Sequence, residues 1–118
     1  MNTNQTEVIK LGNAKFVSFF TIGNCVYGST TTGGGCDALD NSEVICQIEM
    51  STRQIKRIAQ LLSELSFLDG SLLFFADSKR ACEILHKRAH SLQTRLIEIV
   101  GIGAFLSILD TCGLSEVK

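Results

Sequence analysis

The chain has 118 residues, of which 45% are hydrophobic and 19% charged, with a formal net charge of −1. This composition excludes a disordered segment, and the length predicts a single domain, 1–118, around one core. The charge balance makes a nucleic-acid partner unlikely, and the sequence has neither a ~20-residue apolar span nor a secretory signal. We therefore expect a cytoplasmic protein with no membrane partner.

The first part of the chain, 1–41, is predicted to hold hairpin strands and a glycine-rich loop. Gly12-Asn13 and Gly23-Asn24 each lie between apolar, β-rich runs. Glycine adopts a positive φ at little cost, so this pattern is typical of hairpin turns. The predicted strands are 8–11, 16–22 and 25–27, and the Ser/Thr/Gly-rich segment 29–35 is predicted to be a loop.

The second part, 42–118, is predicted to be a βαβαβα unit. A half-buried strand begins near residue 42, with Val44 and Cys46 on one face and Ile45 and Gln47 on the other. Short apolar runs at 71–76 and 95–100 predict two more strands, each covered by helices. The expected fold class is α/β, with a single mixed sheet, N-terminal antiparallel hairpin strands and helices mainly on one face.

Three helices are predicted between and after these strands. Ser51 and Gln54 form a capping-box pattern at the start of the first helix. The second helix is expected to begin at Asp77 or Ser78 and to run to about residue 92. The third helix ends before Gly113, which fits the left-handed position that follows a helix. The expected core positions of the three helices are Ile55, Ile58, Leu62, Leu65, Ala81, Leu85, Ala89, Leu92, Phe105, Leu109 and Cys112.

This order of elements resembles that of the STAS domain, the fold of the anti-sigma-factor antagonists. Phe75-Ala76-Asp77-Ser78 is similar to that family's Phe-x-Asp-Ser-Ser-Gly-like motif at a strand-to-helix turn. The segments 96–101 and 109–114 resemble its last strand and its closing helix end. The resemblance covers roughly residues 42–116.

The resemblance implies a small regulatory module that binds a partner protein at the start of the second helix. In that family a phosphorylatable hydroxyl lies just inside this helix, where the present chain has Lys79. Ser78 is the nearest hydroxyl, an alternative register would use Ser71, and whether either is phosphorylated stays open. The expected partner-binding residues are Asp77, Ser78, Lys79, Arg80, Asp69 and Ser71.

The start of this helix also has a simpler interpretation. The unpaired N–H groups of a helix N-terminus attract an anion, so a small anionic ligand is a possible occupant. The simpler interpretation is that Asp77 or Ser78 serves only as an N-cap, which is the commonest role of these residue types. Two alternatives to the regulatory module remain. One is a homo-oligomeric accessory protein whose partner is its own copy, and the other is a small ligand-binding protein or enzyme that uses the glycine-rich loop and a cysteine.

The glycine-rich loop suggests a small ligand-binding protein or an enzyme that uses a cysteine. Its candidate residues are Gly33, Gly34, Gly35 and Cys36. A phosphate-binding P-loop would need a lysine and a hydroxyl after the glycines, and Asp37 follows Cys36 instead. We therefore expect this segment to be a flexible loop, with a ligand-binding or catalytic site as the alternative.

The cysteines and histidines predict no cofactor and no metal site. Cys82, His86 and His90 recur at helical spacing, but the first and last are about 12 Å apart along the axis, too far for one ion. Five cysteines at irregular spacing favour free thiols over a disulfide framework. Cys46 and Cys112 are expected to be buried, and Cys36 to be accessible.

Overall fold

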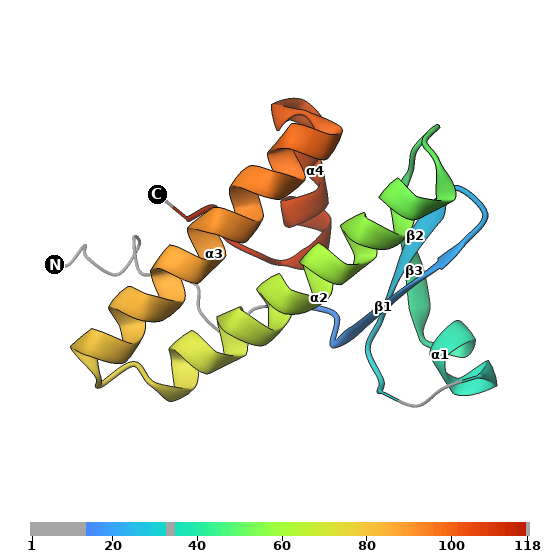
Figure 1. Ribbon diagram of the computed structural model, residues 1–118. Helices are drawn as coiled ribbons and strands as arrows, with labels where there is room; N and C mark the ends of the chain where they lie inside the picture. Colours follow the sequence, from blue (N-terminus) through green and yellow to red (C-terminus); the bar gives the residue numbers. More distant parts are fainter. Residues whose placement is uncertain (1–13, 33–34, 118) are drawn as a thin grey trace, which may run out of the picture.

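The computed structural model, which describes residues 14–32 and 35–117, combines a three-stranded sheet, a long helical hairpin and two shorter helices (Figure 1). The hairpin consists of α2 and α3, which extend side by side away from the sheet. The elements, in chain order, are β1 (Ser18–Ile22), β2 (Cys25–Ser29), α1 (Cys36–Asp40), β3 (Ser42–Gln47), α2 (Thr52–Phe74), α3 (Lys79–Val100) and α4 (Ile102–Cys112).

The sheet is antiparallel throughout, with the order β1-β2-β3. The hairpin predicted at Gly23-Asn24 is confirmed, and Gly23 has a φ of 63° at the first turn position, where a side chain would be strained. The expected mixed sheet is wrong for the described residues, because no parallel strand pair joins these three strands. The predicted strand 8–11 and the turn at Gly12-Asn13 lie outside the described residues.

A bulge changes which side chains of β3 face the core. Val26 pairs with Cys46 and Tyr27 pairs with Val44, so Ile45 is the extra residue between them. The expected alternation is therefore wrong here: Ile45 is buried and Val44 is half exposed. A bulge inserts one residue and shifts the facing of those beyond it, which strict alternation does not foresee.

The predicted strands 71–76 and 95–100 are wrong, because both runs are helical. Residues 71–74 form the last turn of α2, and 95–100 form the end of α3. The buried positions Leu65, Leu68 and Leu72 continue one helical stripe, as do Leu92 and Leu96. No glycine or proline separates residues 95–100 from the preceding part of α3. The helix therefore continues through the β-branched residues of this run. The βαβαβα order is therefore replaced by a sheet followed by three helices.

The predicted helix boundaries are confirmed at three places. Ser51 and Gln54 form the capping box of α2, and the Ser78 hydroxyl caps α3 by accepting from Ala81 N–H. Gly113 adopts the left-handed conformation after α4, with a φ of 71°. The five-residue helix α1 was not predicted.

One hydrophobic core joins the sheet to the three long helices. It combines Phe16, Val26 and Ile45 with the inner faces of α2, α3 and α4. α2 packs against β1 and β2, whereas α4 packs against β3. The stacked rings of Phe20 and Tyr27 lie on the strand positions that alternate with the core positions. Among the described residues, no helix has the length and hydropathy that a membrane crossing requires.

Candidate functional site

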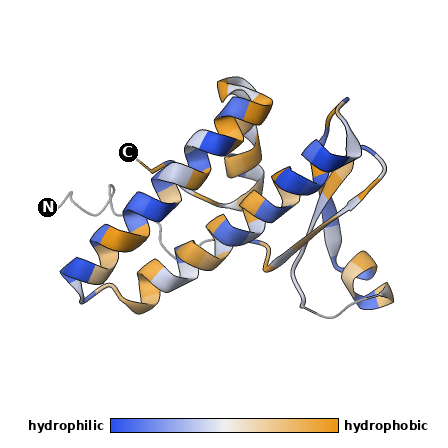
Figure 2. Ribbon diagram, viewed as in Figure 1, coloured by the Kyte–Doolittle hydropathy of each residue, from blue (hydrophilic) through white to orange (hydrophobic). Residues whose placement is uncertain are grey.

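The clearest candidate site is a groove along the C-terminal half of α2, the part of this helix that extends beyond the sheet. Figure 2 shows hydrophobic positions continuing to the last turns of this helix. Because residues three and four apart share a helix face, one continuous stripe forms the α2 side of the groove. Its volume is about 630 Å³, and we call it the α2 groove; its lining residues are Ala14, Phe16, Val17, Ser63, Ser66, Phe67, Asp69, Gly70, Ser71, Leu73, Phe74 and Phe75.

Large apolar side chains of the groove are exposed to solvent. Phe74 is 80% exposed, Phe67 is 74% exposed and Leu73 is 54% exposed. The rings of Phe74 and Phe75 meet edge to face, with centroids 4.8 Å apart. Single exposed apolar residues are ordinary, but several aromatic residues around one concave surface are typical of an interaction site.

The opposite wall of the groove is the segment 14–17, which we call the entry segment. Its centre is fixed by Phe16, which is only 1% exposed. Lys15 N–H donates to the carbonyl of Cys112 at 2.8 Å, and Val17 N–H donates to the carbonyl of Ser29 at 2.8 Å. The entry segment is therefore held to both α4 and the sheet, and this wall is preformed.

The groove also contains polar groups. The hydroxyl oxygen of Ser66 is inaccessible to solvent and has no hydrogen-bond partner among the described residues. Ser71 donates its hydroxyl to the carbonyl of Phe67 at 3.0 Å, as serines inside helices often do. Asp69 is buried, with 8% exposure, and brings a carboxylate to the groove wall.

The residues predicted to bind a partner lie around the end of the helical hairpin. Asp69 and Ser71 line the α2 groove, and Asp77 to Arg80 form the turn into α3 and its first residues. Lys79 and Arg80 are exposed at the start of α3, which follows the aromatic end of α2 in the sequence. The sequence interpretation missed Phe67, Phe74 and Phe75, because it placed the last two in a buried strand.

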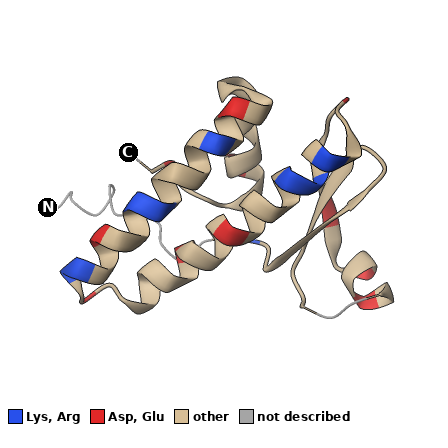
Figure 3. Ribbon diagram, viewed as in Figure 1, with Lys and Arg blue, Asp and Glu red and all other residues tan. Residues whose placement is uncertain are grey.

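The charges separate along the molecule. Figure 3 shows Lys and Arg along α3 and at the start of α2, whereas α1 and β3 carry Asp and Glu; single acidic residues also interrupt α2 and α3. Between residues 79 and 95, α3 carries five basic residues and one acidic residue, Glu83. Arg88 pairs with Glu64 across the two helices at 2.9 Å. The exposed side of the hairpin is therefore basic although the whole chain is nearly neutral.

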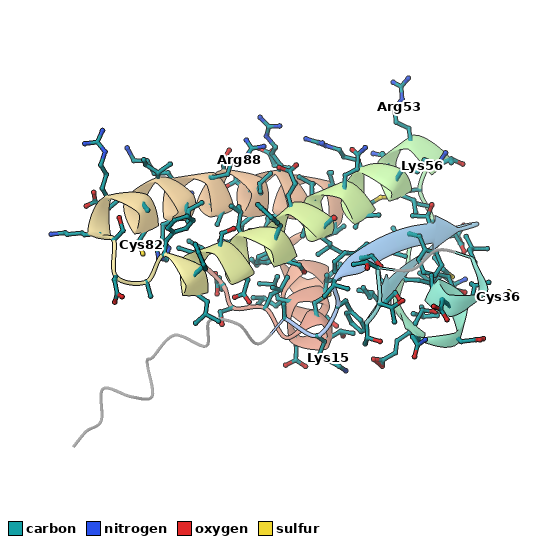
Figure 4. All side chains as sticks on the ribbon, turned by 90° about the horizontal axis from the view of Figure 1, so that it is seen from below. Lys15, Cys36, Arg53, Lys56, Cys82 and Arg88 are labelled. Atoms are coloured by element: carbon teal, nitrogen blue, oxygen red, sulfur yellow. The ribbon has the colours of Figure 1, made fainter. Side chains whose placement is uncertain are left out.

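The glycine-rich loop is far from this site. Gly33 and Gly34 lie outside the described residues, while Gly35 precedes α1 with a φ of 62° and Cys36 is exposed. Figure 4 places Cys36 and Cys82 at opposite ends of the molecule, so Cys36 is also remote from the histidines of α3. Among the described residues, Cys36 belongs to no group of three or more potential metal ligands, and the helix that it begins, α1, has only five residues.

Metal-binding residues do not converge in the described part of the chain. No group of three or more His, Cys, Asp or Glu there is arranged to hold an ion. The Cys82 thiol instead donates to the carbonyl of Phe75 at 3.2 Å, which ties the start of α3 to the end of α2.

The predicted exposure of the thiols is confirmed at two of three positions. Cys112 is fully buried and Cys36 is exposed, but Cys46 is only partly buried. Burial raises the pKa of Cys112 to about 12, with a further increase from the neighbouring Cys46 thiol. Burial likewise raises the pKa of Cys46 to about 11. Both thiols are therefore poor nucleophiles at neutral pH.

No family model, no curated protein and no solved structure matches the chain. The resemblance to the STAS domain thus gains no support from these comparisons. The site must be judged from its own geometry, because fold alone does not determine function.

Proposed function

We propose that the chain is a protein-interaction module that binds an amphipathic helix of a partner protein in the α2 groove. The observation that carries this proposal is the exposure of Phe74 and Phe67, at 80% and 74%, along one concave surface. Aromatic side chains are enriched at the centres of interfaces, where they contribute most of the binding energy.

The shape of the α2 side of the groove favours a helical partner. Small residues alternate with aromatic ones there, and a Cβ added to Gly70 would meet nothing within 4 Å. Small residues let a second helix approach closely, while Phe67 and Phe74 stand as ridges between which its side chains fit. A helix bound in this way presents apolar anchors at positions i, i+3, i+4 and i+7.

The charge beside the groove favours acidic residues on the outer face of that partner. Lys79 and Arg80 are exposed at the start of α3, a few residues after Phe74 and Phe75 in the sequence, and further basic residues follow along α3. Opposite charges at the rim accelerate association and select among partners, more than they add affinity. The regulatory role implied by the STAS resemblance is a narrower form of the same proposal, with the site moved from the helix N-terminus to the groove.

A designed peptide tests the proposal directly. The probe is a fluorescent helical peptide with leucine anchors on one face and glutamate elsewhere, and its matched control carries lysine in place of each glutamate. We expect the acidic peptide to raise fluorescence anisotropy on titration with the full chain, and the basic peptide to bind more weakly. Phe74→Ser should abolish binding, and the double variant Lys79→Glu, Arg80→Glu should slow association.

Stability measurements keep the result interpretable. Phe74, Lys79 and Arg80 are exposed, so these variants should unfold within about 0.5 kcal/mol of the wild type. Equal binding of both peptides, or unchanged binding by Phe74→Ser, would contradict the proposal. Self-association that depends on Phe74 in gel filtration would instead identify a second copy as the partner.

A further inference from the structure

Three arginines lie on the helical hairpin at the end that adjoins the sheet. Arg53 and Arg57 belong to the first turns of α2, and Arg95 belongs to the last two turns of α3. We call these three residues the arginine patch. Figure 4 places the labelled Arg53 and Arg88 on the side of the hairpin that faces away from Lys15.

Two contacts between the helices give the register of the hairpin. The Cys82 thiol donates to the carbonyl of Phe75, and further along α3 the guanidinium of Arg88 binds the carboxylate of Glu64 at 2.9 Å. Later residues of α3 therefore lie beside earlier residues of α2, so the two helices are antiparallel.

This register brings two arginines of the patch to corresponding positions. Arg57 precedes Glu64 by seven residues, and Arg95 follows Arg88 by seven residues. Seven residues make nearly two helical turns and return to the same face with a drift of about 20°. Arg57 and Arg95 therefore occupy the same face as the ion pair, about 10 Å further along both helices. Two cations stand there in place of a cation and an anion.

Basic residues outnumber acidic residues in this half of the hairpin. Residues 52–64 of α2 and 88–100 of α3 include only two acidic residues, Glu64 and Glu98. The five basic residues of the same two segments are Arg53, Lys56, Arg57, Arg88 and Arg95. The near neutrality of the whole chain therefore conceals a local excess of positive charge.

The arginine patch has no anionic partner among the described residues. The ion pairs there join Lys15 to Glu43 and Arg88 to Glu64, and neither includes the patch. Arg57 donates from its guanidinium to the side-chain oxygen of Gln60 at 3.4 Å, and this partner is neutral. Neighbouring like charges on helices repel, and an anion bound between them would relieve that repulsion.

We propose that the arginine patch binds an acidic segment of the same partner whose amphipathic helix occupies the α2 groove. This inference rests on the proposed function for the groove helix, and it adds a second contact and a requirement on the partner's sequence. The planar fork of a guanidinium matches a carboxylate with two parallel hydrogen bonds. The nearly neutral chain lacks the strong long-range field typical of nucleic-acid binding, which favours carboxylates over the phosphates of a nucleic acid.

The distance from the groove sets the spacing of the acidic segment. Phe67 lines the groove, and Arg57 precedes it by ten residues, so the two are about 15 Å apart along the axis of α2. An extended chain covers about 3.3–3.6 Å per residue, so about five residues bridge this distance. Because the patch lies toward the N-terminus of α2, the acidic segment should lie at one end of the partner helix only.

Tailed versions of the acidic peptide test the inference on the full chain. One probe carries a five-residue linker and four glutamates at its N-terminus, and a second probe carries them at its C-terminus. In the matched controls, glutamine replaces each tail glutamate. We expect one of the two tails, and not the other, to tighten binding about tenfold in fluorescence anisotropy at low salt. The gain should shrink at about 0.5 M salt, where exposed charges are screened.

Single substitutions locate the contact. Arg95→Gln and, in a separate protein, Arg57→Gln should remove most of the gain from the tail and leave binding of the tail-less peptide unchanged. Lys87→Gln, at an exposed position of α3 outside the patch, is the matched control and should keep the gain. Arg95 is exposed, so its variant should melt like the wild type, and it serves if Arg57→Gln does not fold.

The outcomes separate this inference from the proposed function. An equal gain from both tails, or a gain that survives both arginine substitutions, would overturn the inference, while binding of the tail-less peptide that depends on Phe74 would leave the proposed function intact. A single-stranded oligonucleotide that binds more tightly than the tailed peptide, and is released by Arg95→Gln, would overturn it in favour of nucleic acid.

The tail peptide alone decides the case in which the tail-less peptide does not bind. Its titration is followed by the backbone amide NMR signals of Arg57 and Arg95. Shifts that Arg95→Gln weakens would support the acidic segment although the proposed function had failed. The absence of such shifts would overturn both.

Discussion

The side-chain amide of Gln93 binds the backbone of Val117 through two hydrogen bonds, each 2.8 Å long. Gln93 donates to the Val117 carbonyl and accepts from the Val117 N–H. Gln93 is only 6% exposed, so these bonds satisfy a polar group inside α3 that would otherwise be costly to bury. They also hold the end of the chain against the helical hairpin, where Val117 packs on the core.

Replacing Gln93 with leucine is expected to destabilise the fold. Both backbone groups of Val117 would lose their partner, which we expect to lower the free energy of unfolding by about 1–3 kcal/mol. Gln93→Glu keeps one acceptor but sets a buried carboxylate oxygen against the Val117 carbonyl, so it should destabilise at least as much. Urea denaturation gives the energies, and hydrogen exchange should accelerate at the Val117 amide.

Thr94→Ala is the matched control, since Thr94 lies next to Gln93 and its hydroxyl donates to the carbonyl of His90 within the same helix. It should leave the Val117 amide as protected as in the wild type. Unchanged exchange in Gln93→Leu would show that the chain end is held by packing instead.

Local signals in the sequence predicted the fold well where they depend on a few adjacent residues. The Ser51 capping box, the Ser78 cap and the turns at Gly23 and Gly113 all follow from the chemistry of single positions. Their physical causes act within one turn of chain, so the printed sequence contains them.

The prediction failed where a short apolar run had no local marker of its state. Residues 71–76 and 95–100 are compatible with a buried strand or with the end of a long helix, and packing between α2 and α3 decides for the helix. The same error hid the candidate site. Phe74 and Phe75 looked like core residues of a strand, whereas the helix places them at an exposed end.

Gly28, in β2, is required by packing rather than by its backbone angle. A Cβ on Gly28 would lie 2.6 Å from ring atoms of Phe16 and 2.8 Å from Ile45. Gly28→Ala should therefore lower the free energy of unfolding by about 1–3 kcal/mol, because the fixed ring of Phe16 cannot move away freely. Thermal and chemical denaturation measure this loss.

Gly103→Ala in α4 provides the comparison for Gly28. A Cβ there would meet nothing within 4 Å, so alanine should be neutral or stabilise the helix by up to about 1 kcal/mol. Equal effects of the two substitutions would mean that Phe16 does not lie against β2 as described.

Ser78 is expected to act as a cap even if it has no role in binding. Its hydroxyl accepts from Ala81 N–H at 3.2 Å. Ser78→Ala should lower the free energy of unfolding by about 1 kcal/mol, whereas Ser78→Asp keeps an acceptor and should be nearly neutral. Ser91→Ala, at an exposed position inside α3, controls for helix propensity, and a loss as large as that of Ser78→Ala would refute the capping role.

Alkaline pH should destabilise the protein through its buried thiols. The native pKa of Cys112 is about 12 and its ordinary value is 9.0, so the native state keeps a proton that the unfolded state loses. Below pH 9 the Cys112 thiol is protonated in both states, so it adds no pH dependence to the free energy of unfolding. Above pH 9 the free energy of unfolding should fall by up to about 1.4 kcal/mol per pH unit, until the native thiol ionises. Cys46, with a native pKa of about 11, acts in the same direction.

Denaturation under reducing conditions between pH 8 and 10.5 measures the slope of this alkaline loss of stability. Cys112→Ala should lower stability at every pH but flatten the slope above pH 9, whereas Cys36→Ser, at an exposed thiol, should keep the wild-type slope. Parallel curves for all three proteins would show that the alkaline loss comes from groups other than Cys112.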